Sequence, residues 1–69
     1  MNIVYITQEW MGAEATEADV VSMIAMLREK GWDARAGVGR SEIDEEENPY
    51  IRETFEHDFA ACLNRIASA

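Results

Sequence analysis

The apolar residues of this 69-residue chain change their spacing along the sequence, and each spacing predicts a different element. Residues 3–6 are consecutive and apolar, which predicts a strand over Asn2–Thr7 that is covered on both faces. A second strand is predicted where apolar residues alternate with polar or glycine residues, because alternation gives a strand one apolar face. Its apolar positions are Trp32, Ala34, Ala36 and Val38.

A helix is predicted between these two strands, over Glu17–Lys30. Thr16 is a favourable N-cap, Asp19 lies at the third helical position, and Gly31 suits the left-handed position after the helix. The core-facing stripe follows the helical spacing i, i+4, i+7 and consists of Val20, Ile24 and Leu27. The segment Gln8–Ala15, which contains Gly12, is expected to be a loop.

A second helix is predicted over Tyr50–Ser68, since Asn48 suits the N-cap and Pro49 the first helical position. One face of it is apolar, formed by Ile51, Phe55, Phe59, Cys62 and Ile66. Before this helix, Ser41–Ile43 has the composition of a short third strand. The predicted fold is therefore a single α/β domain over residues 1–69, in the order β-α-β-(β)-α. A small sheet of two to three strands packs against two helices, and the first two strands are parallel.

Charge restricts the partners that this chain can bind. Fourteen acidic and six basic residues give a formal net charge of −8. Nucleic acid and anionic membranes repel such a chain, whereas basic proteins attract it. The basic residues are scattered singly along the sequence, so direct nucleic-acid binding is not expected. We find no signal peptide and no membrane-spanning segment, and Cys62 has no second cysteine to pair with, so we expect a soluble cytoplasmic protein.

An acidic run is the main candidate site. It places five acids within six residues, Glu42–Glu47. Such runs usually form a solvated, solubilising surface. Alternatively, the run imitates the regularly spaced charges of a phosphate backbone and occupies a Lys/Arg-lined groove. Two acids one turn apart on the second helix would extend that surface. The predicted partner-binding acids are Glu42, Asp44, Glu45, Glu46, Glu47, Glu53 and Glu56.

The sequence gives little support to a metal-binding site or a catalytic site. An EF-hand loop needs a glycine at its sixth position, and none follows Asp44 within the run. His57 and Asp58 are adjacent, so their side chains diverge by about 100° on a helix and cannot orient one another as a triad would. Cys62 lies on the apolar stripe and is interpreted as a small core residue. We therefore expect no cofactor, no metal and no enzymatic activity.

Two apolar features remain beyond the predicted core. The first helix is apolar nearly all round, because Val21 and Met26 lie off its stripe, and a homodimer interface would cover them. The loop after the first strand carries Trp10 and Met11, which either fold back on the core or anchor a partner. We include Trp10 among the predicted partner-binding residues.

In size, in charge and in the run Glu42–Glu47, the chain resembles the small acidic anti-CRISPR proteins and other DNA mimics of phages and mobile elements. These proteins share no common fold or motif, so the resemblance transfers no residue role. It implies a non-enzymatic inhibitor that blocks a basic, nucleic-acid-binding surface of a partner protein. The arginines Arg35 and Arg40, just ahead of the run, depart from that pattern. The alternative is a homodimeric interaction module whose acids serve solubility alone.

Overall fold

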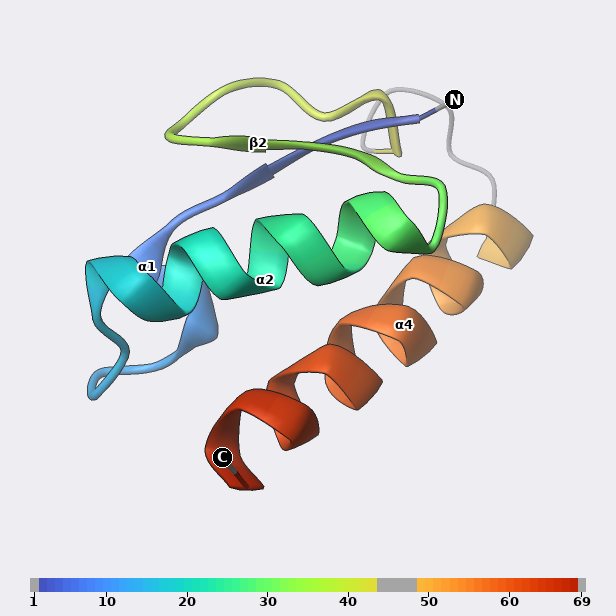
Figure 1. Cartoon of the computed structure of the whole chain (residues 1–69). Helices are drawn as coiled ribbons and strands as arrows, with labels where there is room; N and C mark the ends of the chain where they lie inside the picture. Colours follow the sequence, from blue (N-terminus) through green and yellow to red (C-terminus); the bar gives the residue numbers. More distant parts are fainter. Residues whose placement is uncertain (1, 44–48, 69) are drawn as a thin grey trace.

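The computed structural model describes residues 2–43 and 49–68, which form a two-stranded sheet with helices packed on one of its faces (Figure 1). The strands are β1 (Ile3–Ile6) and β2 (Asp33–Ala36), and the long helices are α2 (Glu17–Glu29) and α4 (Pro49–Ser68). A single-turn helix, α1 (Gln8–Met11), follows β1. The α/β fold class predicted from the sequence is confirmed.

Both predicted strands form, but two details of their predicted patterns are wrong. β1 is buried on one face and not on both, and Val38, predicted on the apolar face of the second strand, lies beyond β2 and is 95% exposed. β1 and β2 are parallel, with Ile3 opposite Asp33 and Ile6 opposite Ala36. α2 makes the crossover between them, as parallel neighbours require. Along β1, Val4 and Ile6 are buried while Ile3 and Tyr5 are partly exposed, so one face of the sheet supplies the core and the other retains contact with solvent.

α2 begins and ends as its sequence predicts. The Thr16 side chain accepts a hydrogen bond from the Asp19 backbone, and the Asp19 carboxylate accepts one from the Thr16 backbone at 2.9 Å, which completes a capping box. After the helix, Gly31 has φ +100, a left-handed conformation that glycine adopts without strain. These two ends fix the direction in which the chain enters β2.

The short third strand considered at Ser41–Ile43 does not form, since Glu42 and Ile43 are helical. This segment instead runs beside the free edge of β1 and uses side chains to bond it. The backbone N–H of Tyr5 donates to Ser41 Oγ and that of Ile3 donates to Glu42 Oε2, each at 3.2 Å. The outward N–H groups of β1 thereby have side-chain acceptors, although no third strand pairs with this edge.

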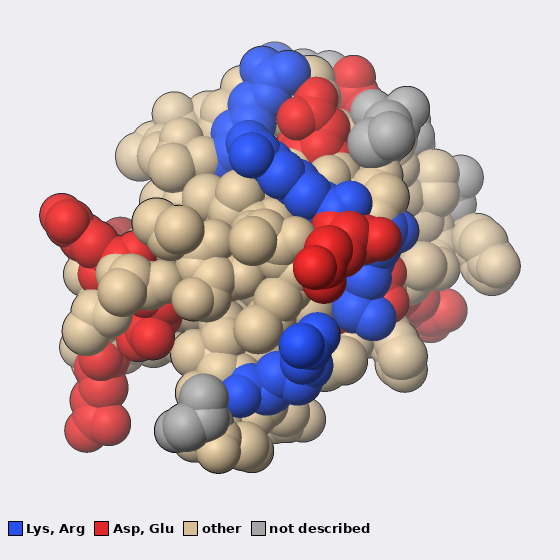
Figure 2. Space-filling model, in the orientation of Figure 1, with Lys and Arg blue, Asp and Glu red and all other residues tan. Residues whose placement is uncertain are grey.

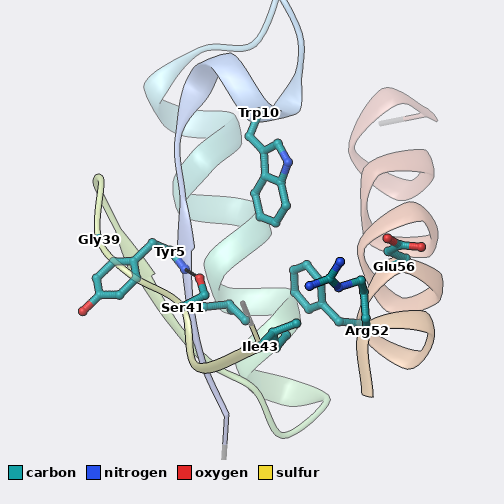
Figure 3. A pocket seen from close by; sticks show the side chains of 9 residues that line it. Tyr5, Trp10, Gly39, Ser41, Ile43, Arg52 and Glu56 are labelled. Carbon is teal, nitrogen blue, oxygen red and sulfur yellow. Dashed lines mark hydrogen bonds between the residues drawn. The ribbon is translucent and has the colours of Figure 1, made fainter. Parts of the chain in front are cut away.

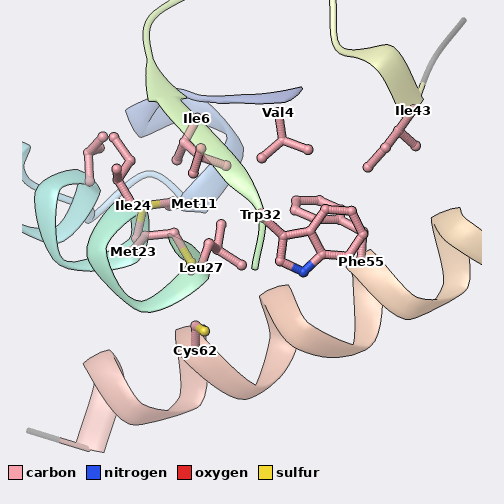
Figure 4. Close-up of a cluster of buried hydrophobic side chains, with 12 residues drawn as sticks. Val4, Ile6, Met11, Met23, Ile24, Leu27, Trp32, Ile43, Phe55 and Cys62 are labelled. Carbon is pink, nitrogen blue, oxygen red and sulfur yellow. The ribbon is translucent and has the colours of Figure 1, made fainter. Parts of the chain in front are cut away.

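A single apolar core joins the sheet, α2 and α4 (Figure 4). α2 packs against β2 on one side and against α4 on the other, so α4 reaches the sheet mainly through α2. α2 lies directly against the sheet, and α4 contributes Phe55 and Cys62 to the same core. The fully buried side chains include Ile6, Met23, Leu27, Val4 and Cys62. Among the described residues, no helix combines the length and apolarity needed to cross a membrane.

Candidate functional site

A pocket of about 350 Å³ opens between β1, the segment 39–43 and the first turns of α4 (Figure 3). Segments far apart in the sequence meet there, and its walls combine aromatic, aliphatic and charged side chains. We call this the Trp10 pocket. It is lined by Val4, Tyr5, Trp10, Gly39, Ser41, Ile43, Arg52, Phe55 and Glu56.

Trp10 forms one wall of this pocket, and both its backbone and its ring have contacts that hold it in place. The Thr7 hydroxyl accepts a hydrogen bond from the Trp10 backbone N–H at 3.3 Å, which caps α1 at its start. The indole stacks on Phe55 at 5.6 Å between ring centroids and contacts Phe59 at 4.9 Å. Even so, Trp10 remains 51% exposed. One face of the ring packs on α4 and the rest meets solvent, and the partner-anchoring role considered for this residue stays a prediction.

The opposite wall depends on a glycine. A Cβ placed at Gly39 would lie 2.5 Å from Cζ of the Tyr5 ring, so a side chain at this position would require the Tyr5 ring to shift. Beyond Gly39, Ser41 bonds the edge of β1 and Ile43 is buried in the core. This wall therefore has contacts at three points, Gly39, Ser41 and Ile43, the last of which lies inside the acidic run.

Charged groups enter the pocket from α4. Arg52 and Glu56 lie one turn apart on this helix and both line the pocket. Figure 3 shows Arg52 extending from α4 below Trp10, toward the wall that carries Ser41 and Ile43. Glu53, predicted to extend the acidic surface together with Glu56, is exposed but does not line the pocket. The structure thus brings Glu56 together with Trp10 and places Glu53 outside.

The described residues include the first end of the acidic run. Glu42 is partly buried, and its carboxylate accepts the Ile3 N–H, so this acid has a structural contact in addition to its predicted role. Asp44, Glu45, Glu46 and Glu47, together with the predicted N-cap Asn48, lie outside the described residues. Ile43, the second residue of the run, lines the Trp10 pocket.

The residues that the sequence analysis considered for catalysis, His57, Asp58 and Cys62, are not among the residues that line the Trp10 pocket. His57 Nδ1 lies 3.6 Å from Asp58 Oδ1, beyond hydrogen-bond distance, and the His57 side chain is 85% exposed. The other Asp58 oxygen accepts the indole N–H of Trp32 at 2.8 Å, which ties α4 to the start of β2. Cys62 is fully buried, and burial raises the pKa of its thiol, as expected of a core cysteine. Within residues 2–43 and 49–68, no group of three His, Cys, Asp or Glu side chains is arranged to hold a metal ion.

The basic residues are less dispersed in space than in sequence. Figure 2 shows an interrupted line of Lys and Arg side chains across one face, with acidic side chains beside it. Arg35 donates two hydrogen bonds to Asp33, at 2.9 and 3.3 Å, and this bonding lowers the pKa of the Asp33 carboxyl. Arg28 lies near the same carboxylate and donates from Nε to the Ala34 carbonyl at 3.0 Å.

Sequence reasoning missed the participation of Tyr5, Gly39 and Arg52 in the site. The pair Gly37 and Gly39 was the available signal, since a glycine often marks a close approach of the backbone to another group. Comparisons with protein-family models, with curated proteins and with solved structures find no match to this chain.

Proposed function

We propose that this protein is a non-enzymatic binder that docks on, and blocks, a basic nucleic-acid-binding surface of a partner protein. In this proposal Trp10 is the apolar anchor and the acidic residues supply the attraction. The observation that carries the proposal is the half-exposed indole of Trp10, stacked on Phe55 at the mouth of a pocket that also contains Glu56.

A tryptophan in this state has the properties of an interface anchor. Its ring is large and is already immobilised by Phe55 and Phe59, so little conformational entropy is lost when a partner covers it. Tryptophan is among the residues that most often dominate binding energy at protein interfaces. A core role alone would favour complete burial, as is nearly reached by Trp32, which is 8% exposed.

Charge supports a basic partner. The formal net charge of −8 favours encounter with positively charged surfaces and selects against acidic ones. Glu53 and Glu56 are exposed on α4, and Ile43 of the acidic run lines the pocket together with Glu56. Nucleic-acid-binding proteins display the matching Lys/Arg grooves, because they must neutralise several phosphates. An acidic surface with an apolar anchor would bind in such a groove and exclude the nucleic acid.

The proposal is tested by binding and by competition. The purified protein captures partners from a host lysate at low and at high salt, and each captured protein is then assayed for binding to labelled DNA or RNA. We expect a captured protein to lose its nucleic acid when this chain is added in equimolar amount, and capture to weaken at high salt. Capture of proteins that keep their nucleic acid would contradict the proposal.

Three variants separate the anchor from the charge. Trp10→Ala should weaken binding by roughly thirtyfold or more, the loss typical of an interface hot spot. The double variant Glu45→Lys/Glu46→Lys should weaken binding strongly at low salt and less at high salt. Glu14→Lys/Glu29→Lys makes the same change in net charge at two exposed positions outside the pocket lining, so it is the matched control. Equal effects of the two double variants would show that net charge alone drives binding and would refute a defined docking site.

A further inference from the structure

The Trp10 pocket combines an apolar interior with charges of both signs on one side. The buried side chains of Val4, Ile43 and Phe55 line it, and the half-exposed Trp10 ring forms a wall. Small-molecule sites are mostly apolar with a few polar groups, and the volume of about 350 Å³ lies at the lower end of their range. The pocket therefore has the size and the lining to hold one small molecule with an apolar part.

Arg52 and Glu56 carry the charges among the described residues that line the pocket, and neither forms an ion pair within that part of the chain. They have the four-residue spacing of a helical ion pair, but the cation comes first, which is the weaker order. Glu42, which follows Ser41 on the opposite wall, does not line the pocket, and its carboxylate accepts the Ile3 N–H. One cation and one anion thus face a ligand in this pocket.

The positions of these two groups suit a ligand that carries two opposite charges close together. Figure 3 shows Arg52 and Glu56 on the α4 side of the pocket and Tyr5 and Ser41 on the opposite side. Four residues of helix separate Arg52 from Glu56 by about 6 Å along the axis, so both long side chains can reach one small molecule. An α-amino acid has its ammonium and carboxylate groups on the same carbon atom, next to its side chain.

From this arrangement we propose that the Trp10 pocket binds a free aromatic α-amino acid. The ring of the ligand enters the apolar interior and packs on the open part of the Trp10 indole, in an offset or edge arrangement. Its carboxylate pairs with Arg52 and its ammonium group pairs with Glu56. A residue inside a peptide has neither charge and a chain terminus has only one, so the two charges select the free amino acid. The proposal does not rest on the docking of a partner protein.

The test is an NMR titration of the purified protein, without any partner, with L-phenylalanine as the probe. We expect a saturable shift of the Trp10 indole N–H signal with a Kd of about 1 mM or lower. The Trp32 indole N–H, which is bonded to Asp58, should shift less. Phenethylamine lacks the carboxylate and phenylpropionate lacks the ammonium group, so each should bind roughly threefold to fivefold more weakly. No saturable shift up to about 10 mM, or equal affinity for all three probes, would overturn the proposal.

Two substitutions that each remove one charge test the two ion pairs separately. Arg52→Gln should weaken binding of phenylalanine and phenylpropionate by roughly threefold to fivefold, but should not weaken binding of phenethylamine, which has no carboxylate. Glu56→Gln should weaken binding of phenylalanine and phenethylamine and not of phenylpropionate. Arg65→Gln and Glu29→Gln make the same changes at exposed positions outside the pocket lining, so they are the matched controls. If each variant binds all three probes as its control does, the proposal is refuted.

Discussion

Among the polar side chains described above, we expect Asp58 to contribute most to stability, through its hydrogen bond with Trp32. This bond joins α4 to the start of β2, and its donor belongs to a side chain that is 8% exposed. Asp58→Ala would leave the indole N–H without its acceptor, and a buried unsatisfied donor costs about 1 to 3 kcal/mol. A chain of this length has a total stability of roughly 3 to 10 kcal/mol. The substitution should therefore remove a large share of it and lower Tm by roughly 5 to 20 °C.

Two further variants test this reasoning. Asp58→Asn retains an acceptor without the charge, so it should lose about half as much, since charged hydrogen bonds are roughly twice as strong as neutral ones. Trp32→Phe removes the donor together with part of the core packing against Phe55, so a double-mutant cycle is needed to isolate the bond. Urea unfolding followed by circular dichroism provides the free energies. A loss below about 0.5 kcal/mol for Asp58→Ala, the range typical of surface substitutions, would refute the reasoning.

Three other predictions follow from packing and ionisation. Leu27→Ala should lower the free energy of unfolding by about 2 to 5 kcal/mol in the same assay, because Leu27 is fully buried. Arg35→Gln should lower Tm at neutral pH but not well below pH 3.8, the ordinary pKa of an Asp. The hydrogen bond from Arg35 lowers the folded-state pKa of Asp33, so its stabilisation is present above 3.8 and is lost as the pH falls through the folded value. Thiol reagents should label Cys62 slowly in the native protein and rapidly in urea, since the folded chain buries this thiol and raises its pKa; rapid native labelling would contradict this.

Local signals predicted most of the fold. The capping box at Thr16, the left-handed Gly31 and the alternation after Trp32 each act within a few residues, so the sequence alone identified α2 and β2. The short helix α1 was missed because four residues are too few to show a helical period. Its capping residue Thr7 was the available sign.

Non-local contacts account for the remaining differences. Ser41 and Glu42 bond to β1 through their side chains, and no periodicity in the sequence distinguishes that from a backbone-paired strand. The same limitation applies to the candidate site. Trp10 was singled out as either a core residue or a partner anchor, but its stacking on Phe55 and its place in one pocket lining with Arg52 depend on how α4 packs on α2. Sequence pattern gives the face of each helix and does not give the angle at which two helices meet.

The side-chain capping of β1 has a consequence for the order in which the chain is completed during synthesis. The bonds that close its free edge join residues 36 and 39 positions apart, Tyr5 with Ser41 and Ile3 with Glu42. A nascent chain that ends before Ser41 can already contain both strands and α2, yet the outer N–H groups of its first strand still lack these acceptors. Until residue 42 has emerged from the ribosome, that strand can recruit the wrong neighbour. Helix α4, which supplies Phe55 and Cys62 to the core, emerges later still, so we expect the native state to be reached only after this helix has also left the ribosome.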